Sequence, residues 1–389
     1  MARPVFRQTA EACHGQEMKT QVDSTKRNGG SLPGIASESA TNVSLTIAPQ
    51  DRILVTGAAG FIGLHVVESL VQRGFRNISC FVRPSSELRA IEAVVDRRPV
   101  GVRIEVFKGN LLTLADCEAA CKDVVVIYHL AAGTGEKSFP DVFMNSAVAT
   151  RNLLEASLLH AHLRRFVLVS SLAVYTNRQS SRCLDESCPI EEHPELRGDA
   201  YCFAKVKQEQ IVTQYAKDFN IPYVIVRPGS VYGGGKRQIT GRVGLGTFGL
   251  FLHLGGSNTI PFTYVANCAE AIALAGLVPG VDGEVFNVVD DDPPSSCRFL
   301  RLYKKNVRRF KSVYVPHMAS FGLCYLWEKY SQWSKGQLPP AFNRRRWYAE
   351  WKKTRYSNKK LRTMLGWAPK LTTTEGLRLY FESCSQGEQ

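Results

Sequence analysis

Short apolar runs alternate with stretches of helical periodicity along most of the chain after residue 51. The runs are rich in β-branched and aromatic residues, which is typical of strands buried on both faces of a sheet. The segments between them are long enough for crossover helices, so the pattern predicts β-α-β units. The predicted strands are Ile53–Val55, Ile78–Val82, Val102–Phe107, Val124–Tyr128, Phe166–Val169 and Tyr223–Val226.

This alternation predicts an α/β fold, a Rossmann doubly wound parallel sheet with a smaller C-terminal substrate-binding lobe. We expect the dinucleotide-binding part to occupy residues 51–235, with 264–290 returning to it, and the lobe to comprise 236–263 and 291–389. Residues 1–50 show no sustained hydrophobic period. They would bury too little surface to offset the entropy of ordering, and we predict a disordered segment.

The formal net charge of +14 is concentrated near the C-terminus, because residues 301–389 hold 19 Lys and Arg against 5 Glu and no Asp. Such a field would attract an anionic substrate or a membrane surface, or form a solvated basic face. No recognition motif accompanies it, so we do not expect nucleic acid as a partner. Residues 312–327 are uncharged and contain Pro316, which predicts a buried or interfacial helix too short to span a bilayer and allows peripheral membrane contact.

The 11 cysteines are irregularly spaced and predict neither a disulfide framework nor a metal site. Cys117 and Cys121, for example, share a helical pattern without a nearby His or second Cys pair. We therefore expect reduced thiols and a cytoplasmic protein.

A glycine-rich loop follows the first predicted strand directly and opens a helical pattern. Glycine permits the tight turn and brings backbone N–H groups close to a pyrophosphate, whose charge the helix N-terminus favours. A literal GxGxxG match at residues 244–249 does not follow a strand, and we discount it. The loop residues that we assign to a nicotinamide dinucleotide are Gly57, Gly60, Phe61, Ile62 and Gly63.

The end of the second predicted strand carries no carboxylate, although an NAD-binding fold usually places one there for the ribose hydroxyls. Arg83 lies at this position and would bind a 2′-phosphate, so NADP(H) is favoured over NAD(H). The alternative is that Arg83 stacks on the adenine.

Three residues predict hydride and proton transfer at a carbon that bears oxygen. Ser171 follows the strand Phe166–Val169, at the sheet edge where open α/β folds bind ligands. Tyr201 and Lys205 are four residues apart and share one face of a helical pattern. A phenol is a poor base at neutral pH, and the Lys205 cation would favour its phenolate. Tyr201 would then exchange the proton of the substrate oxygen while Ser171 hydrogen-bonds that oxygen.

With these residues the chain resembles the extended short-chain dehydrogenase/reductase superfamily, in its NAD(P)-dependent epimerase/dehydratase group, from about Arg52 to Gly283. The resemblance implies that Ser171 is catalytic and that Ser170 is its structural neighbour. It also implies that His129 is packed in the sheet. Further motifs that carry the resemblance are Gly109-Asn110-Leu111, His129-Leu130-Ala131-Ala132, Asn145, Asn152, Arg227-Pro228-Gly229 and Tyr232-Gly233. The cofactor contacts that it implies are Asn110, Leu111, Ala131, Ala132, Tyr201, Lys205 and Pro228.

Members of this group either interconvert an alcohol and a ketone with exchangeable cofactor, or epimerise and dehydrate nucleotide sugars with tightly held NAD. Arg83 favours the first activity, as do residues 264–271 and 365–367, which look similar to hydroxysteroid-dehydrogenase-like or flavonoid-reductase-like members. The substrate would be a small hydroxyl or keto compound, either a sterol-like lipid or a nucleotide sugar. The resemblance also implies a homodimer, formed through the Tyr201 helix and residues 144–158.

Basic residues near the C-terminus keep the epimerase alternative open. Arg344–Arg346 and Lys352–Lys353 would clamp a sugar diphosphate, since guanidinium groups match phosphate oxygens in pairs. Beside them are three aromatic residues, Trp347, Tyr348 and Trp351. We expect these rings to pack in the core; the alternatives are a platform on which a base stacks and a belt at a lipid interface. A catalytically silent dinucleotide-sensing protein is the third alternative, which the intact Ser171, Tyr201 and Lys205 oppose.

Overall fold

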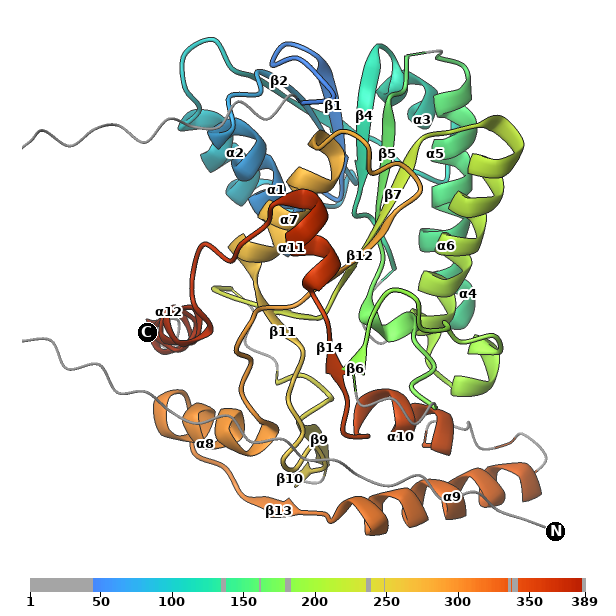
Figure 1. The fold of residues 1–389 in the computed structure, drawn as a ribbon, viewed down its shortest axis with the longest axis vertical. Coiled ribbons are helices and arrows are strands. Elements are labelled where there is room, and N and C mark those ends of the chain that lie inside the picture. Colours follow the sequence, from blue (N-terminus) through green and yellow to red (C-terminus); the bar gives the residue numbers. More distant parts are fainter. Residues whose placement is uncertain are drawn as a thin grey trace, which may run out of the picture. The chain divides into compact units, whose positions relative to one another are not determined.

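A seven-stranded parallel sheet organises the chain, in the strand order β12-β7-β5-β4-β1-β2-β3 (Figure 1). The computed structural model describes residues 45–133, 138–160, 162–178, 183–235, 239–247, 249–334, 337 and 342–386. The six predicted strands are confirmed, and the Rossmann class with them. The strands are β1 (Arg52–Thr56), β2 (Asn77–Val82), β3 (Arg103–Lys108), β4 (Val124–His129), β5 (Arg165–Val169), β7 (Tyr223–Pro228) and β12 (Val285–Val288).

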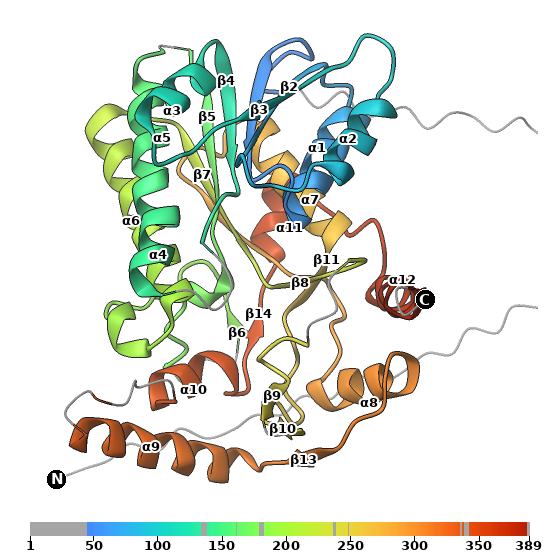
Figure 2. The same ribbon diagram turned by 180° about the vertical axis from the view of Figure 1, so that it is seen from behind.

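Helices cover both faces of the sheet, as Figures 1 and 2 show from opposite sides. Neighbouring strand residues point to opposite faces, so Val55 packs into one apolar core and Leu54 into the other. The first face carries α1 (Phe61–Gln72), α2 (Arg89–Asp96), α7 (Val265–Leu277) and α11 (Lys359–Leu365). The second carries α3 (Leu114–Cys121), α4 (Phe139–Phe143), the π-helical turn Met144–Val148, α5 (Ala149–Leu158) and α6 (Ala200–Phe219).

The strand order reverses beside β1, whose neighbours are β2 on one side and β4 on the other. Connections leave this point in opposite directions, and open α/β folds bind ligands at the carboxyl ends of the strands beside such a point. The loops after β1, β4 and β5, which carry the predicted site residues, all lie at that edge.

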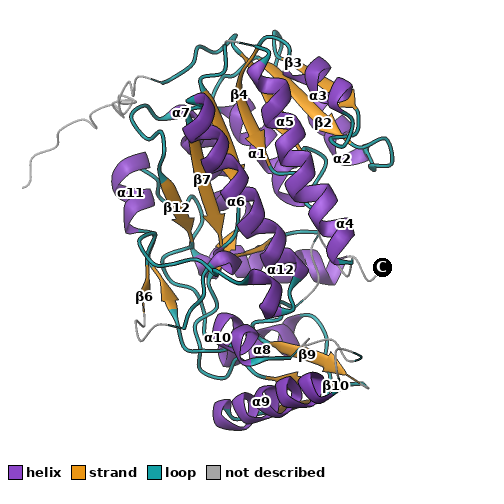
Figure 3. Ribbon diagram, turned by 90° about the vertical axis from the view of Figure 1, so that its right-hand side faces the viewer, coloured by secondary structure: helices purple, strands orange, loops and turns teal. Residues whose placement is uncertain are grey.

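The remaining elements lie beyond this edge of the sheet (Figure 3). Three small sheets join β8 (Ser230–Tyr232) to β11 (Phe262–Tyr264), β6 (Cys183–Leu184) to β14 (Arg355–Tyr356), and β9 (Gly244–Thr247) to β10 (Leu250–His253) and β13 (Ser312–Tyr314). The helices are α8 (Ser296–Asn306), α9 (His317–Trp333), α10 (Arg344–Glu350) and α12 (Thr373–Gln386), with 3-10 turns at Leu172–Val174 and Pro194–Arg197.

Aromatic side chains form much of the core of this region. Tyr232, Phe262, Phe299 and Tyr380 pack together in one cluster. Trp351 is 1% exposed and its indole N–H donates to the Gly241 carbonyl, so its predicted place in the core is confirmed.

The N-terminal prediction covers residues 1–50, of which residues 1–44 lie outside the described residues. Nearer to β1, the Thr46 N–H donates to the Leu277 carbonyl at 2.8 Å, and Ile47 is buried against the sheet core. The division into a dinucleotide-binding part and a lobe stays a prediction, although α7 and β12 do return to the sheet from within 264–290.

Two segments with ambiguous patterns have definite structures. Gly244 begins β9, where an added Cβ would lie 2.0 Å from the Leu252 carbonyl oxygen, so close strand pairing and not a phosphate explains this glycine.

Residues 312–327 contain a strand before the helix, because Pro316 caps the start of α9. The alternative of a buried helix is wrong for α9, since most of its large apolar side chains are exposed, although Phe321 and Trp327 are half-buried.

Candidate active site

The loop between β1 and α1 is shaped for close approach of a phosphate. Gly57 has φ +70°, a conformation that favours glycine. A Cβ on Gly63 would lie 2.2 Å from the Gly57 carbonyl oxygen, and one on Gly60 would lie 3.0 Å from it. No side chain caps the N-terminus of α1, and its first turn holds no acidic residue. The loop and helix therefore fit a dinucleotide pyrophosphate through backbone N–H groups and the helix dipole.

His129 ends β4 and is fully buried beside this loop. Its Nδ1 accepts from the Thr56 hydroxyl at 2.8 Å, and its Nε2 lies 2.9 Å from the Thr150 hydroxyl oxygen. Thr150 donates its own proton to the Ser146 carbonyl, so His129 Nε2 must be the donor in that pair. Burial, followed by the nearby Lys205 cation, lowers the pKa of His129 to about 3. His129 is thus a neutral packing residue, as predicted.

Ser171 and Tyr201 are brought together from β5 and α6. Ser171 lies two residues after the end of β5 and caps a 3-10 turn, accepting from the Ala173 N–H. Tyr201 lies in the first turn of α6, which Asp199 caps by accepting from the N–H groups of Tyr201 and Cys202. The Ser171 hydroxyl hydrogen-bonds the Tyr201 phenol. Both residues are partly buried.

Lys205 lies one turn further along α6, with its Nζ 5.9 Å from the Tyr201 ring centroid. Its ammonium donates to the Val169 carbonyl at 2.8 Å and to Gln208 Oε1 at 2.9 Å. Burial lowers the pKa of Lys205 to about 8, against the charge of Glu209, which raises it. Lys205 is therefore cationic at neutral pH and close to its titration point.

Burial raises the pKa of Tyr201 to about 12, with the hydrogen bond from Ser171 acting in the opposite direction. The phenol is therefore protonated at neutral pH in this structure. We predicted that the Lys205 cation lowers this pKa, but Lys205 is not among the groups that shift it. This protonation state suits proton donation to a carbonyl oxygen.

Gln208 connects Lys205 to the glycine loop through buried groups. Its Nε2 donates to the Thr150 hydroxyl at 2.7 Å, and Thr150 contacts His129. His129 in turn bonds Thr56, whose hydroxyl oxygen accepts from the Ala131 N–H at 3.3 Å. Sequence reasoning missed Gln208 and Thr150. The only signal for Gln208 was its position three residues after Lys205 on the same helix.

Ser170 faces away from this chain of contacts and supports the sheet edge. Its hydroxyl donates to Glu209, which is buried and paired with Arg227 through two hydrogen bonds of 2.7 and 2.9 Å. Arg227 also donates to the Tyr175 hydroxyl at 2.9 Å. This network holds the ends of β5 and β7 against α6, beside Pro228 at the end of β7.

The predicted adenine-side residues lie after β2 and β3. Arg83 follows β2 and is exposed; its backbone carbonyl accepts from the Ser86 N–H at 2.9 Å, and its guanidinium makes no hydrogen bond or ion pair to the described residues. Asn110 follows β3, and its side chain accepts from the Leu112 N–H at 3.0 Å. The Leu111 carbonyl accepts from Asn152 Nδ2, which ties this loop to α5. Arg83 is thus accessible to a phosphate.

The three consecutive arginines of α10 are each engaged by a carboxylate. Arg344 bonds Glu328 at 3.0 Å, Arg345 bonds Glu191 at 2.6 Å, and Arg346 bonds Glu350 at 3.0 Å. The predicted diphosphate clamp would have to break these ion pairs.

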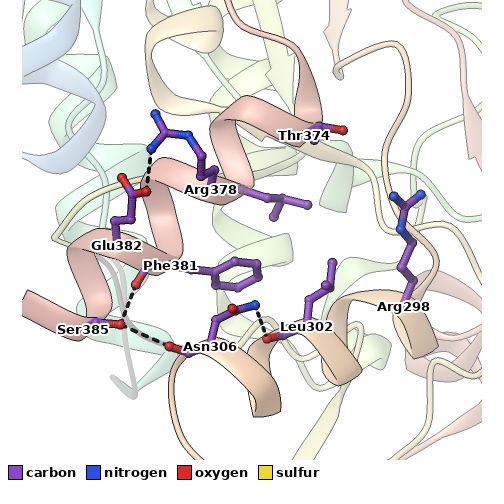
Figure 4. A pocket seen from close by; sticks show the side chains of 9 residues that line it. Arg298, Leu302, Asn306, Thr374, Arg378, Phe381, Glu382 and Ser385 are labelled. Atoms are coloured by element: carbon purple, nitrogen blue, oxygen red, sulfur yellow. Dashed lines mark hydrogen bonds and ion pairs between the residues drawn. The ribbon is translucent and has the colours of Figure 1, made fainter.

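A cavity of about 540 Å³ lies between α8 and α12, away from every predicted site residue (Figure 4). Leu302 and Phe381 form its apolar wall. Its Arg378 is held by Glu375 and Glu382. We assign no part of the chemistry to this cavity.

The model of the NAD-dependent epimerase/dehydratase family matches residues 53–288. The chain is similar to an uncharacterized UDP-glucose epimerase of Bacillus subtilis, with 31% identity over 273 residues, which cover 64% of this chain and 80% of that protein. It is similar to a 3-beta-hydroxysteroid dehydrogenase of Mycolicibacterium neoaurum, with 25% identity over 346 residues, covering 84% and 89%.

Among solved structures, UDP-glucuronic acid 4-epimerase from Bacillus cereus in complex with NAD superimposes with a TM-score of 0.65. The sequence identity is 22%, and the match covers 87% of this chain and 100% of that one. At this identity the likeness shows the fold alone. The resemblance predicted from the motifs is confirmed by the family match.

Proposed function

Because the chain belongs to the NAD-dependent epimerase/dehydratase family, we propose that it is an NAD(P)-dependent oxidoreductase that interconverts an alcohol and a ketone. The observation that carries this proposal is the hydrogen bond between Ser171 and Tyr201, one helical turn from the buried Lys205. A bound dinucleotide would supply or take up hydride at the substrate carbon.

The side chains of the pair would handle the oxygen and its proton. In ketone reduction Tyr201 donates its proton to the carbonyl oxygen, while Ser171 hydrogen-bonds the same oxygen. The Lys205 ammonium, fixed by Val169 and Gln208, lies 5.9 Å from the Tyr201 ring centroid and would be the cation beside the phenolate that this transfer leaves. Since the Tyr201 pKa is about 12 before substrate binds, reduction is the direction in which Tyr201 starts in its reactive form.

We propose NADPH as the preferred cofactor, on the basis of Arg83. Its guanidinium is exposed directly after β2, and no carboxylate stands at the strand end. The test compares kcat/KM for NADPH and NADH in the unaltered enzyme and in Arg83→Asp. A fall of about tenfold or more in the NADPH preference supports this assignment. An unchanged ratio means that Arg83 does not bind the 2′-phosphate.

Nucleotide-sugar epimerisation is the second candidate, since UDP-sugar epimerases are among the relatives. Two observations favour the oxidoreductase. The arginines of α10 are already paired with carboxylates, and the hydroxysteroid dehydrogenase aligns over more of this chain than the UDP-glucose epimerase does. Incubation with NADPH and a panel of ketones separates the two: cofactor consumption supports reduction, whereas co-purified NAD without net consumption supports epimerisation.

We propose a small hydroxyl or keto substrate of sterol-like character, and a cytoplasmic enzyme that contacts a membrane peripherally. None of the helices in the described ranges has the length and apolar composition needed to cross a bilayer. We also propose a homodimer through α5 and α6. Light scattering coupled to gel filtration measures its mass, and a monomer at micromolar concentration would contradict it.

A further inference from the structure

The helix α9 departs from the usual amphipathic pattern. Small or polar residues face the protein: Ser320, Cys324 and Ser331 are buried, and the Ser320 hydroxyl accepts from the Trp347 indole N–H at 2.9 Å. Glu328 is paired with Arg344 of α10. Phe321 and Trp327 are half-buried against Trp347 and Phe342, but the other large apolar residues of α9 are exposed, although a surface helix normally buries them.

Most of the exposed side chains of α9 are apolar or aromatic; the exceptions are Lys329 and Gln332. Met318 is 82% exposed, Leu326 62% and Trp333 76%. Helical spacing puts them on one side, because residues three, four, seven and eight apart share a face. An exposed apolar patch of this kind marks a surface of interaction. We define the outer face of α9 as its exposed residues, which are Met318, Ala319, Leu323, Tyr325, Leu326, Lys329, Tyr330, Gln332 and Trp333.

The surroundings of this face are basic. Residues 305–311 lead from α8 into β13 and α9, and Lys305, Arg308, Arg309 and Lys311 are exposed there. Among residues 305–334 the one acidic residue is Glu328, which is occupied by Arg344. Figures 1 and 2 show β13 and α9 together at the end of the described fold that is farthest from the amino ends of the sheet strands.

We propose that the outer face of α9 inserts into the headgroup region of an anionic lipid bilayer and lies parallel to its surface. Apolar side chains would enter the acyl boundary, and the flanking lysines and arginines would meet lipid phosphates. Tyr325, Tyr330 and Trp333 suit this depth, because amphipathic rings prefer the membrane–water interface. A second copy of the chain is the poorer occupant, since a two-fold contact would bring Lys329 and the basic segment against themselves.

This docking rests on the membrane contact proposed above and assigns it to one helix. The carboxyl edge of the sheet faces the same end of the molecule as α9, so a lipophilic ketone dissolved in the bilayer would be close to that edge. The docking does not depend on turnover. Binding and catalysis are therefore measured separately, and either can fail alone.

The experiment is flotation of the full chain with vesicles of phosphatidylcholine containing phosphatidylserine, and with vesicles of phosphatidylcholine alone. We expect flotation with the anionic vesicles and at least about tenfold weaker binding by Leu326→Glu. The matched control is Val100→Glu, which makes the same kind of change at a fully exposed apolar residue between α2 and β3 and is expected to float normally. Circular dichroism establishes that both variants are folded.

A second measurement uses the unaltered outer face. Brominated lipids quench tryptophan fluorescence at contact distance, so they should quench the wild type more than Trp333→Phe. Failure of the wild type to float, equal flotation of Leu326→Glu, or equal quenching in Trp333→Phe overturns the proposal. If light scattering shows a wild-type dimer that Leu326→Glu converts to a monomer, without any vesicle binding, the face is an interface between copies.

Discussion

Replacement of Gln208 by Leu tests how the protonation of Lys205 is maintained. Gln208 is fully buried, and its Oε1 accepts from Lys205 Nζ at 2.9 Å. Leucine keeps an apolar body of similar volume but removes this acceptor. The Val169 carbonyl and the Glu209 carboxylate then remain as the groups that favour the ammonium.

The expected magnitude comes from this one lost contact. A hydrogen bond to a charged group contributes about 1.5–3 kcal/mol, and each pKa unit corresponds to about 1.4 kcal/mol. The pKa of Lys205 should therefore fall from about 8 by about one to two units. Two neighbouring groups do not interfere with a titration of Lys205 between about pH 6 and 8. The pKa of His129 is about 3, and that of Tyr201 is about 12.

The assay is NADPH oxidation with a reducible ketone between pH 5.5 and 9.5, since kcat/KM reports the groups of the free enzyme. If turnover needs the Lys205 cation, the basic limb of the profile moves to lower pH in Gln208→Leu. The loss should be about tenfold at pH 8 and should shrink toward the acid end. Gln208→Glu supplies a charged acceptor and should move the limb to higher pH. An equal loss at every pH in both variants would refute the coupling and leave Gln208 a packing role.

Three further predictions concern other parts of the site. Tyr201→Phe should reduce turnover by about 10²–10⁴-fold while the dissociation constant for NADPH, measured by fluorescence, stays the same; retained turnover would remove Tyr201 from its role. Gly63→Ala places a methyl group 2.2 Å from the Gly57 carbonyl oxygen, so the free energy of unfolding should fall by about 1–3 kcal/mol, seen as a lower melting temperature, and NADPH binding should weaken. Normal binding would show that the loop can rearrange. Arg345→Gln should lower the free energy of unfolding by about 1–3 kcal/mol, because buried Glu191 loses the arginine of its ion pair. The affinity for a UDP-sugar, measured by calorimetry, should not change; a large loss of affinity would support the diphosphate clamp after all.

The sheet could be predicted from the sequence because its signals are local. Ile53 to Val55 and the glycines that follow specify a strand, a turn and a helix start within 12 residues. Tyr201 and Lys205 are one helical turn apart, so their neighbourhood was also visible. These features depend on spacing along the chain and on steric limits at glycine.

The rest depends on contacts between distant segments. Arg345 pairs with Glu191, 154 positions away, and nothing near Arg345 announces this partner. The 312–327 segment is conspicuous for its lack of charge, but the direction of its apolar side chains is decided by packing on α10. Likewise, Thr150 reaches Gln208 only because α5 packs on α6.

Transfer of deuterium from NADPH that carries deuterium at both C4 positions of the nicotinamide tests the central claim most directly. The enzyme is incubated with the labelled cofactor and a ketone that it consumes, and the product is analysed by mass spectrometry and NMR. We predict one deuterium on the carbinol carbon for each NADPH oxidised, and labelled product formed about 10²–10⁴-fold more slowly with Tyr201→Phe. Conversion of a UDP-sugar by enzyme-held NAD, with no net consumption of NADPH and no deuterium in any alcohol, would contradict the account.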